Sequence, residues 1–170
     1  MSEIPLQIPL RLRYSALIRE WRAHTGLSLA GFASQVGLRR QYLWTLEHGA
    51  SFTLSTLESI LGNIRGAAYE PPLVAQVGAR LLQARVERGW SQELLSERSG
   101  TSIQHLSKIE RGIGNSSLDV IDALTTHLGI AGEYAIEGLE GPQLEERLAA
   151  VRRSCIAFKI AADSATDSDV

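Results

Sequence analysis

A segment of 28 residues occurs twice in this chain, and this repeat constrains the fold more than any other feature of the sequence. Residues 22–49 align without gaps with residues 85–112, and eight of the 28 positions are identical, whereas chance gives about two. The identical pairs are Arg22/Arg85, Gly26/Gly89, Ser28/Ser91, Gly37/Gly100, Gln41/Gln104, Leu43/Leu106, Glu47/Glu110 and Gly49/Gly112. A one-residue insertion after Gly112 then brings Leu118 into register with Leu54. Self-similarity of this kind indicates two copies of one small module.

Each copy has the pattern of short helices separated by glycines, because apolar residues recur three and four positions apart and strand signals are sparse. In the first copy the expected helices cover residues 10–25, 28–36, 39–47 and 54–62. In the second copy they run from Leu73 to Gly89, from Ser91 to Gly100, from Thr101 or Ser102 to Gly112, and over residues 118–129 after a capping pair of Ser116 and Asp119. Two adjacent prolines predict a linker over residues 66–73. The expected fold class is all-α.

Both copies carry the spacing of a helix-turn-helix. A small residue is followed four positions later by a glycine, and six positions further by an aliphatic residue. The two triplets are Ala33, Gly37, Leu43 and Ser96, Gly100, Leu106. Two helices joined by a tight turn can cross closely only if the contact residue is small and the turn residue tolerates a positive φ angle. The spacing therefore predicts a helix-turn-helix in each copy.

The second copy resembles a known family. Residues 80–124 carry "SQELLS" after Gly89, "TSIQHLSK" after Gly100 and then "IERG", and in these motifs they resemble the lambda-repressor-like, or Xre-type, helix-turn-helix family. Residues 14–61 resemble it more weakly. The resemblance implies two tandem five-helix domains, over residues 1–66 and 74–130, joined by a linker at residues 67–73. It also implies a sequence-specific transcriptional regulator, most simply a repressor, that binds double-stranded operator DNA as a dimer or through two modules on neighbouring half-sites.

In the second copy, the resemblance implies that the third helix, residues 102–110, enters the major groove. The base-reading residues are then Ser102, Ile103, Gln104 and Lys108, and the phosphate contacts are Gln92, Arg111 and Arg98. Gln104 can pair with adenine, Lys108 can donate to guanine, and Ile103 can pack on a thymine methyl group. The alternative for each basic residue is a solvated surface charge.

The first copy departs from the family pattern. Leu29 stands where the second copy has Gln92, so that phosphate contact is missing. Its third helix, residues 39–47, offers Arg39, Arg40, Gln41 and Thr45 at the base-facing positions, although the arginines could equally contact phosphates. Tyr42 and Trp44 occupy outward positions, and an aromatic pair outside a small domain favours a protein contact. Binding to DNA and conversion into an interaction module both remain open for this copy.

Two charged pairs are markers of the fold. The resemblance pairs an arginine near the end of the first helix with the glutamate that closes the third, here Arg22 with Glu47 and Arg85 with Glu110. We expect both to be structural ion pairs with no chemical role.

The C-terminal segment, residues 131–162, belongs to neither copy. Residues 129–141 are glycine-rich and are expected to form a short strand or a loop, and a helix is expected over residues 142–162. Apolar residues at heptad spacing on this helix include Leu144, Leu148, Val151, Cys155 and Phe158. This seam fits either a homodimer or packing against the chain itself. Residues 163–170 have the composition of a disordered acidic tail.

Composition excludes several other classes of protein. A single cysteine rules out an internal disulfide framework and fits a reducing cytoplasm, and no apolar run is long enough to span a membrane.

The net charge of −2 divides into +2 for residues 1–70, zero for residues 71–130 and −4 for residues 131–170, so the two copies are free of the acidic bias of the tail. No two of the four histidines stand at metal-ligand spacing, and nucleophile and phosphate-loop motifs are missing. We therefore expect no enzyme, no metal and no cofactor.

A second function stays open beside the DNA-binding regulator. In an antitoxin or adaptor, the first copy and the C-terminal helix would hold a protein partner, and DNA binding would serve autoregulation. Tyr42, Trp44 and the heptad seam motivate this alternative.

Overall fold

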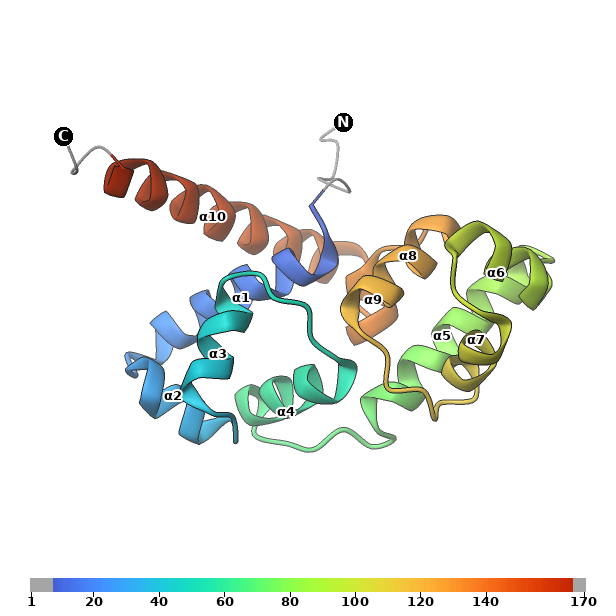
Figure 1. Ribbon diagram of the computed structural model, residues 1–170, viewed down its shortest axis with the longest axis horizontal. Helices are drawn as coiled ribbons and strands as arrows, with labels where there is room; N and C mark the ends of the chain where they lie inside the picture. Colours follow the sequence, from blue (N-terminus) through green and yellow to red (C-terminus); the bar gives the residue numbers. More distant parts are fainter. Residues whose placement is uncertain (1–7, 167–170) are drawn as a thin grey trace. The chain divides into compact units, whose positions relative to one another are not determined.

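The computed structural model describes residues 8–166 and the side chains as far as residue 155. This part of the chain contains ten α-helices and no strand (Figure 1), which confirms the expected all-α class. The helices are α1 (Leu10–Thr25), α2 (Leu29–Gln35), α3 (Arg40–Glu47), α4 (Leu54–Arg65), α5 (Leu73–Glu87), α6 (Gln92–Ser99), α7 (Ile103–Glu110), α8 (Leu118–Leu128), α9 (Gly132–Glu137) and α10 (Gly141–Thr166). Among the described helices, none is both long enough and apolar enough to cross a membrane.

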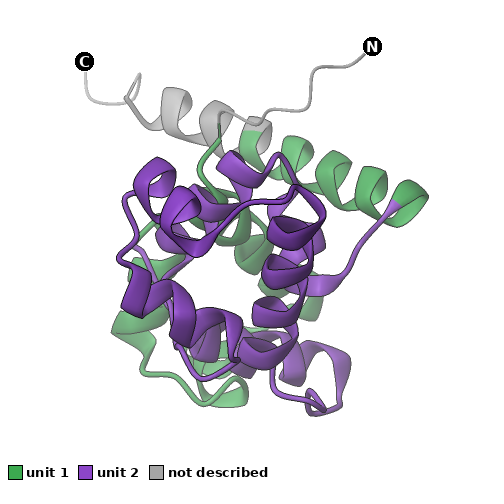
Figure 2. Ribbon diagram, turned by 90° about the vertical axis from the view of Figure 1, so that its right-hand side faces the viewer, with its two compact units in different colours: residues 1–50, 141–170 green, residues 51–140 purple. Residues whose placement is uncertain are grey.

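The chain forms two compact units (Figure 2). Unit 1 is built from residues 1–50 and 141–170, and unit 2 from residues 51–140. Helix α4 packs against α5 within unit 2, and α10 packs against α1 within unit 1. The sequence placed residues 51–66 in the first domain and residues 131–140 in the C-terminal segment, whereas both ranges belong to unit 2.

Unit 1 has α10 lying along α1. Leu148 and Val151 of α10 are fully buried, and the Ser154 hydroxyl donates to the Ala16 carbonyl oxygen at 2.9 Å. The Arg147 guanidinium lies 5.3 Å from the centre of the Trp21 ring. Two residues of the heptad seam, Leu148 and Val151, therefore pack against the chain itself.

Unit 2 is organised around α5, which contacts α4, α7, α8 and α9. Gly78 on α5 is buried, and a Cβ atom at this position would lie 3.2 Å from the backbone nitrogen of Gly112 and closer still to the carbonyl oxygen of Ile109. Only a glycine lets α5 approach the C-terminal end of α7 this closely. The approach fixes how α7 lies on the unit.

The expectation of a strand or loop over residues 129–141 is wrong. Residues Gly132–Glu137 form the helix α9, and Arg80 on α5 donates to the carbonyl oxygens of Ala135 and Ile136 at 3.1 and 2.9 Å. Ala135 and Ile136 are also fully buried. A six-residue helix is marginal alone, so these contacts from distant residues explain why the local glycine pattern misled the prediction.

Two further expectations need correction at helix ends. The side chain that caps α8 is Ser117, whose hydroxyl accepts from the backbone N–H of Val120, while the predicted cap Ser116 is buried with its hydroxyl 2.9 Å from His105 Nε2. Helix α10 also continues through Thr166, inside the tail that was expected to be disordered from residue 163. Residues 167–170 of that tail lie outside the described residues.

Candidate nucleic-acid interface

Helices α6 and α7 of unit 2 form a helix-turn-helix. Gly100 ends α6 in the left-handed conformation with φ 72°, and the Ser102 hydroxyl begins α7 by accepting from the backbone N–H of His105. Leu106 and Ile109 are the buried face of α7. The opposite face of the helix is therefore left at the surface.

The exposed face of α7 carries the residues predicted to read bases. Ile103 is 43% exposed, and Gln104 and Lys108 are exposed as well. Ser102 is also exposed, but its oxygen already serves as the helix cap. An apolar side chain, an amide and a cation thus stand together on one helix. Side chains of these three kinds can distinguish base edges in a major groove.

The charge on this face is positive. Lys108 and Arg111 are exposed, and the Arg111 Nε–H donates to the carbonyl oxygen of Ser107 at 3.3 Å. The acidic residue of α7, Glu110, is 7% exposed and ion-paired. Phosphates approaching α7 would therefore meet cations, a condition for affinity to duplex DNA.

Glu110 is the centre of a buried polar network. Its carboxylate accepts from Arg85 Nε at 2.5 Å and from Arg85 Nη2 at 2.8 Å, and it also accepts from Gln92 Nε2 at 2.6 Å. Arg85 Nη1 further donates to the Trp90 carbonyl oxygen. The hydrogen bond to Glu110 raises the pKa of Arg85, so this guanidinium stays charged. The network ties α5, α6 and α7 together, and Gln92 takes part in it at the position where a phosphate contact was expected.

Arg98 and Glu93 modify the charge around α6. Arg98 is exposed, and its guanidinium lies 4.4 Å from the centre of the Trp90 ring, which holds the side chain against the surface. Hydrogen bonds from its own backbone and from Ser91 lower the pKa of Glu93, so this exposed carboxylate is negative at neutral pH. Of the residues predicted to contact phosphate, Arg111 stands beside the predicted base-reading face and bonds to a backbone carbonyl of α7. Gln92 bonds to the Glu110 carboxylate, and Arg98 lies on the Trp90 ring.

The third helix of the first copy, α3, presents a different set of side chains. Arg39, Arg40 and Gln41 are exposed at its N-terminal end. Thr45 is half-buried, and its hydroxyl donates to the Tyr42 carbonyl oxygen at 2.6 Å. Two arginines and a glutamine therefore stand where the second copy has Ser102, Ile103 and Gln104.

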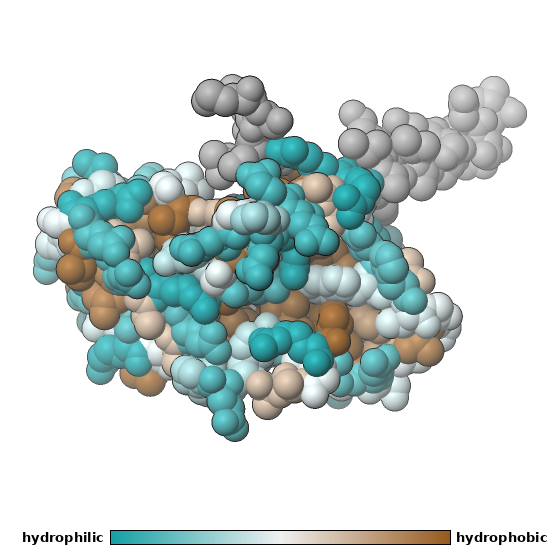
Figure 3. Space-filling view, turned by 180° about the vertical axis from the view of Figure 1, so that it is seen from behind, coloured by the Kyte–Doolittle hydropathy of each residue, from teal (hydrophilic) through white to brown (hydrophobic). Residues whose placement is uncertain are grey.

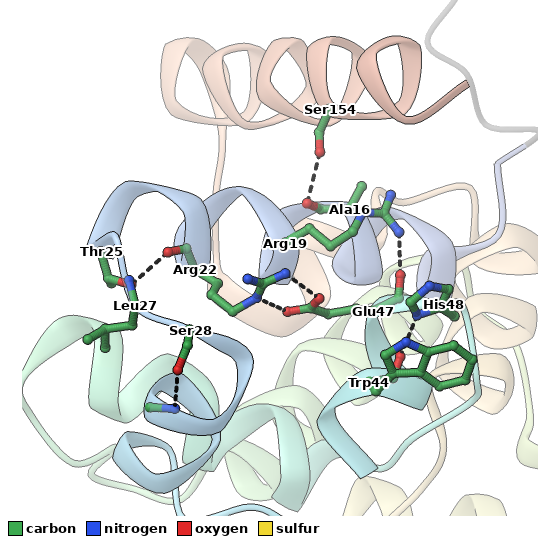
Figure 4. A network of polar contacts seen from close by, with 11 residues as sticks. Ala16, Arg19, Arg22, Thr25, Leu27, Ser28, Trp44, Glu47, His48 and Ser154 are labelled. Carbon is green, nitrogen blue, oxygen red and sulfur yellow. Dashed lines mark hydrogen bonds and ion pairs between the residues drawn. The ribbon is translucent and has the colours of Figure 1, made fainter. Parts of the chain in front are cut away.

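Exposed aromatic side chains lie on the same helix. Trp44 is 46% exposed and Tyr42 is 38% exposed. The Trp44 ring stacks on His48 with ring centres 4.0 Å apart, and His48 Nδ1 lies 2.7 Å from the Trp44 carbonyl oxygen. The stack holds the indole in one orientation at the surface (Figure 4).

The first copy has its own version of the buried network (Figure 4). Arg22 donates to the Glu47 carboxylate from Nε at 2.6 Å and from Nη2 at 2.9 Å, so both predicted ion pairs are present. Arg19 donates from Nη1 to the Glu47 carbonyl oxygen, and burial lowers the pKa of its guanidinium. Leu29, which replaces the glutamine of the second copy, is half-buried.

The remaining candidate interface residues lie on α10. Leu148 and Val151 are buried against unit 1, and Leu144 and Cys155 are half-buried. Burial raises the pKa of the Cys155 thiol. The side chain of Phe158 lies outside the described residues.

The rest of the described surface is mixed in polarity. On the face drawn in Figure 3, brown hydrophobic patches are scattered among hydrophilic side chains. The most exposed large apolar residues are Ile113 at 65% and Val86 at 59%. Ile113 follows α7 directly, so it adds an apolar side chain at the end of the candidate interface.

Three residues of unit 2 support the interface without having been predicted to do so. Trp90 lies under Arg98, His105 reaches Ser116, and the Asn115 side-chain oxygen accepts from the backbone N–H of Ser55 at 3.1 Å. The repeat carries a signal for the last contact, because the insertion after Gly112 makes residues 51–54 and 115–118 equivalent.

Comparison with known proteins identifies the second copy. Residues 81–134 match the model of a Helix-turn-helix family, so the chain contains one Xre-type helix-turn-helix domain. Domains of this family typically bind DNA and are not catalytic. The match does not extend to a second copy in residues 1–66. The search of curated proteins found no match, and the search of solved structures found none either.

Proposed function

We propose that this protein is a sequence-specific transcriptional regulator that binds double-stranded DNA, and most simply a repressor that occupies an operator. The observation that carries the proposal is the exposed face of α7, where Ile103, Gln104 and Lys108 stand together within the matched helix-turn-helix. Gln104 pairs with adenine, Lys108 donates to guanine acceptors, and Ile103 packs on a thymine methyl group.

The first copy supplies a second reading helix in this proposal. Arg39, Arg40 and Gln41 are exposed at the start of α3, and the acidic residue of that helix, Glu47, is buried in an ion pair. The exposed part of α3 is thus basic, as the exposed part of α7 is. One chain would then read two half-sites about 34 Å apart.

A titration of the purified protein against duplexes from the region upstream of its own gene tests the proposal. We expect affinity to depend on sequence and to fall steeply as the salt concentration rises. Gln104→Ala should relax the preference at one base position, and Arg111→Ala should weaken binding to all sequences alike and flatten the salt dependence.

Gln83→Ala is the matched control. Gln83 is an exposed glutamine on α5 whose amide donates to Glu87 at 2.8 Å, and it lies outside both recognition helices. This variant should bind as the unmodified protein does. Binding without sequence preference, or binding that is insensitive to salt, would refute the proposal.

A specific observation favours the second candidate function, an antitoxin or adaptor. Trp44 is exposed and held in one orientation by His48, which suits an anchor residue in a protein interface. Helix α10 supports this function less, because Leu148 and Val151 are already covered by unit 1. Copurification of a stoichiometric partner that is lost in Trp44→Ala, and retained in Gln104→Ala, would favour it.

A further inference from the structure

A depression in the surface of unit 2 lies at the C-terminal end of α4 (Figure 1) and has a volume of about 510 Å³. All eight residues that line it belong to unit 2, and they come from the last two turns of α4 and from the segment that follows, as far as Tyr69. Sites for small molecules have volumes of about 300–1,000 Å³. None of the residues assigned above to DNA binding or to the two ion pairs lines this depression.

One face of α4 supplies the polar wall of the depression. Glu58 and Ser59 are followed four positions later by Gly62 and Asn63, and residues four apart lie above one another on a helix. Gly62 has no side chain, so it leaves room beside the carboxylate of Glu58. Helix α4 ends at Arg65, and its last carbonyl groups add partial negative charge at this end.

Glu58 gives the wall its charge. Among the eight lining residues, all of which the structure describes, it is the only charged one, and it is half-buried. Its Oε2 atom accepts from the backbone N–H of Leu73 at 3.2 Å, and a carboxylate has acceptor capacity for further hydrogen bonds. The Asn63 side-chain amide donates to the Ser59 carbonyl oxygen at 2.8 Å, which leaves its own side-chain oxygen to accept. The wall therefore offers a negative charge and hydrogen-bond acceptors.

The segment after α4 supplies apolar and aromatic surface. Ala67, Ala68 and Tyr69 line the depression, and Tyr69 is only 8% exposed, so its ring is held by the fold. The Arg65 guanidinium lies 4.3 Å from the centre of that ring, and Arg65 itself does not line the depression. Small apolar side chains beside a polar wall suit a ligand with one apolar part and one polar part.

We propose that this depression binds a small organic cation, namely a primary amine with an apolar body. An ammonium group has three N–H donors and no acceptor, which matches the acceptors of Glu58 and Asn63. Its charge is complementary to the Glu58 carboxylate and to the C-terminal end of α4, whereas an anion would be repelled by both. The inference goes beyond the proposed function and does not depend on DNA binding, because the depression shares no residue with α7.

Titration calorimetry of the full chain at pH 7 with three ligands of one size tests the inference. The ligands are benzylamine, benzyl alcohol and benzoate, which carry a positive charge, no charge and a negative charge on the same ring. We expect benzylamine to bind with a Kd of about 1 mM, and the other two to bind at least about 10-fold more weakly, because they lack the charged hydrogen bond to Glu58. Benzylamine should also shift the backbone amide resonances of residues 58–69 in a nitrogen-15 correlation spectrum, and leave those of α7 in place.

Two variants that remove the same charge separate the site from the general charge of the protein. Glu58→Gln keeps a side-chain oxygen for the Leu73 N–H but loses the negative charge, so it should weaken benzylamine binding about 10-fold and leave benzyl alcohol binding unchanged. Glu97→Gln, at an exposed position on α6, should bind all three ligands as the unmodified protein does. Circular dichroism of both variants checks that they are folded.

Four results would each overturn the inference. They are the absence of benzylamine binding, equal affinity for benzylamine and benzyl alcohol, equal benzylamine affinity of the two variants, and resonance shifts confined to residues outside 58–69. A Glu58 that only supports the start of α5 would change stability without changing the preference among the three ligands. Each of these results leaves DNA binding by α7 untouched, and a failure of DNA binding leaves the ligand titration untouched.

Discussion

Replacing Gly78 by alanine tests the close approach of α5 to α7, on which the presentation of the proposed reading helix depends. An added Cβ atom would lie less than 3.0 Å from the carbonyl oxygen of Ile109 and 3.2 Å from the backbone nitrogen of Gly112. Both atoms belong to the backbone at the C-terminal end of α7. The overlap can be relieved only by shifting one of the two helices, since no flexible side chain can move aside.

The expected loss of stability follows from two opposing effects. Overpacking of a tight interior costs about 1–3 kcal/mol, and a collision with backbone places this variant at the upper end of that range. Alanine in place of glycine inside a helix raises the free energy of unfolding by about 1 kcal/mol. We therefore expect the free energy of unfolding of unit 2 to fall by about 2 kcal/mol, which corresponds to roughly 8–16 °C in melting temperature for a domain of this size.

Urea unfolding followed by far-ultraviolet circular dichroism and by tryptophan fluorescence measures this loss. Gly62→Ala on α4 is the matched control, because its Cβ atom would meet the Ala67 carbonyl oxygen at an ordinary 3.4 Å. The control should keep the stability of the unmodified protein or gain up to about 1 kcal/mol. Equal stability of the two variants would show that α5 and α7 are not in the close contact described here.

Three further outcomes are expected from the buried contacts. Arg85→Ala should destabilise unit 2 by about 3–5 kcal/mol in urea unfolding, because Glu110 stays buried without its ion-pair partner, and replacing both residues by apolar ones should restore much of the loss. Leu148→Ala should destabilise unit 1 by about 2–5 kcal/mol, measured by urea unfolding followed by circular dichroism, and an unchanged transition would contradict the packing of α10 on α1. Cys155 should react with iodoacetamide more slowly in the folded protein than in urea, and its rate should rise at a higher pH, because its raised pKa leaves less thiolate at any pH below it. A rate equal to that of the unfolded chain would contradict this burial.

The exposed face of α7 could be predicted from the sequence because its signals are local. Gly100 has a positive φ angle, Ser102 caps the helix, and the buried positions Leu106 and Ile109 recur three residues apart. Each of these properties depends on residues within about two helical turns. Once they are known, the side chains at the outer positions of the helix are known as well.

Contacts between distant residues were the main source of error. Residues 129–141 were expected to form a strand or a loop because of their glycines, yet residues 132–137 form α9. Arg80 binds carbonyl groups of α9 from 55 and 56 positions away. The partners of Gln92 and Arg98 were also missed, because a sequence shows that these side chains can reach the surface but not that Glu110 and Trp90 lie nearer.

The amino-acid sequence by itself determined that the chain is helical, and that residues 22–49 repeat the helix-and-glycine pattern of residues 85–112. Periodicity, caps and glycine turns are encoded by neighbouring residues, so a linear reading recovers them. Only the tertiary structure decided that α10 covers α1, and that residues 52–54 pair reciprocally with residues 116–118. The reason is that the composition of the chain allows several apolar faces and backbone segments to pack against one another. Which of these pairings forms depends on which one gives every buried polar group a hydrogen-bond partner and buries the apolar side chains at the same time.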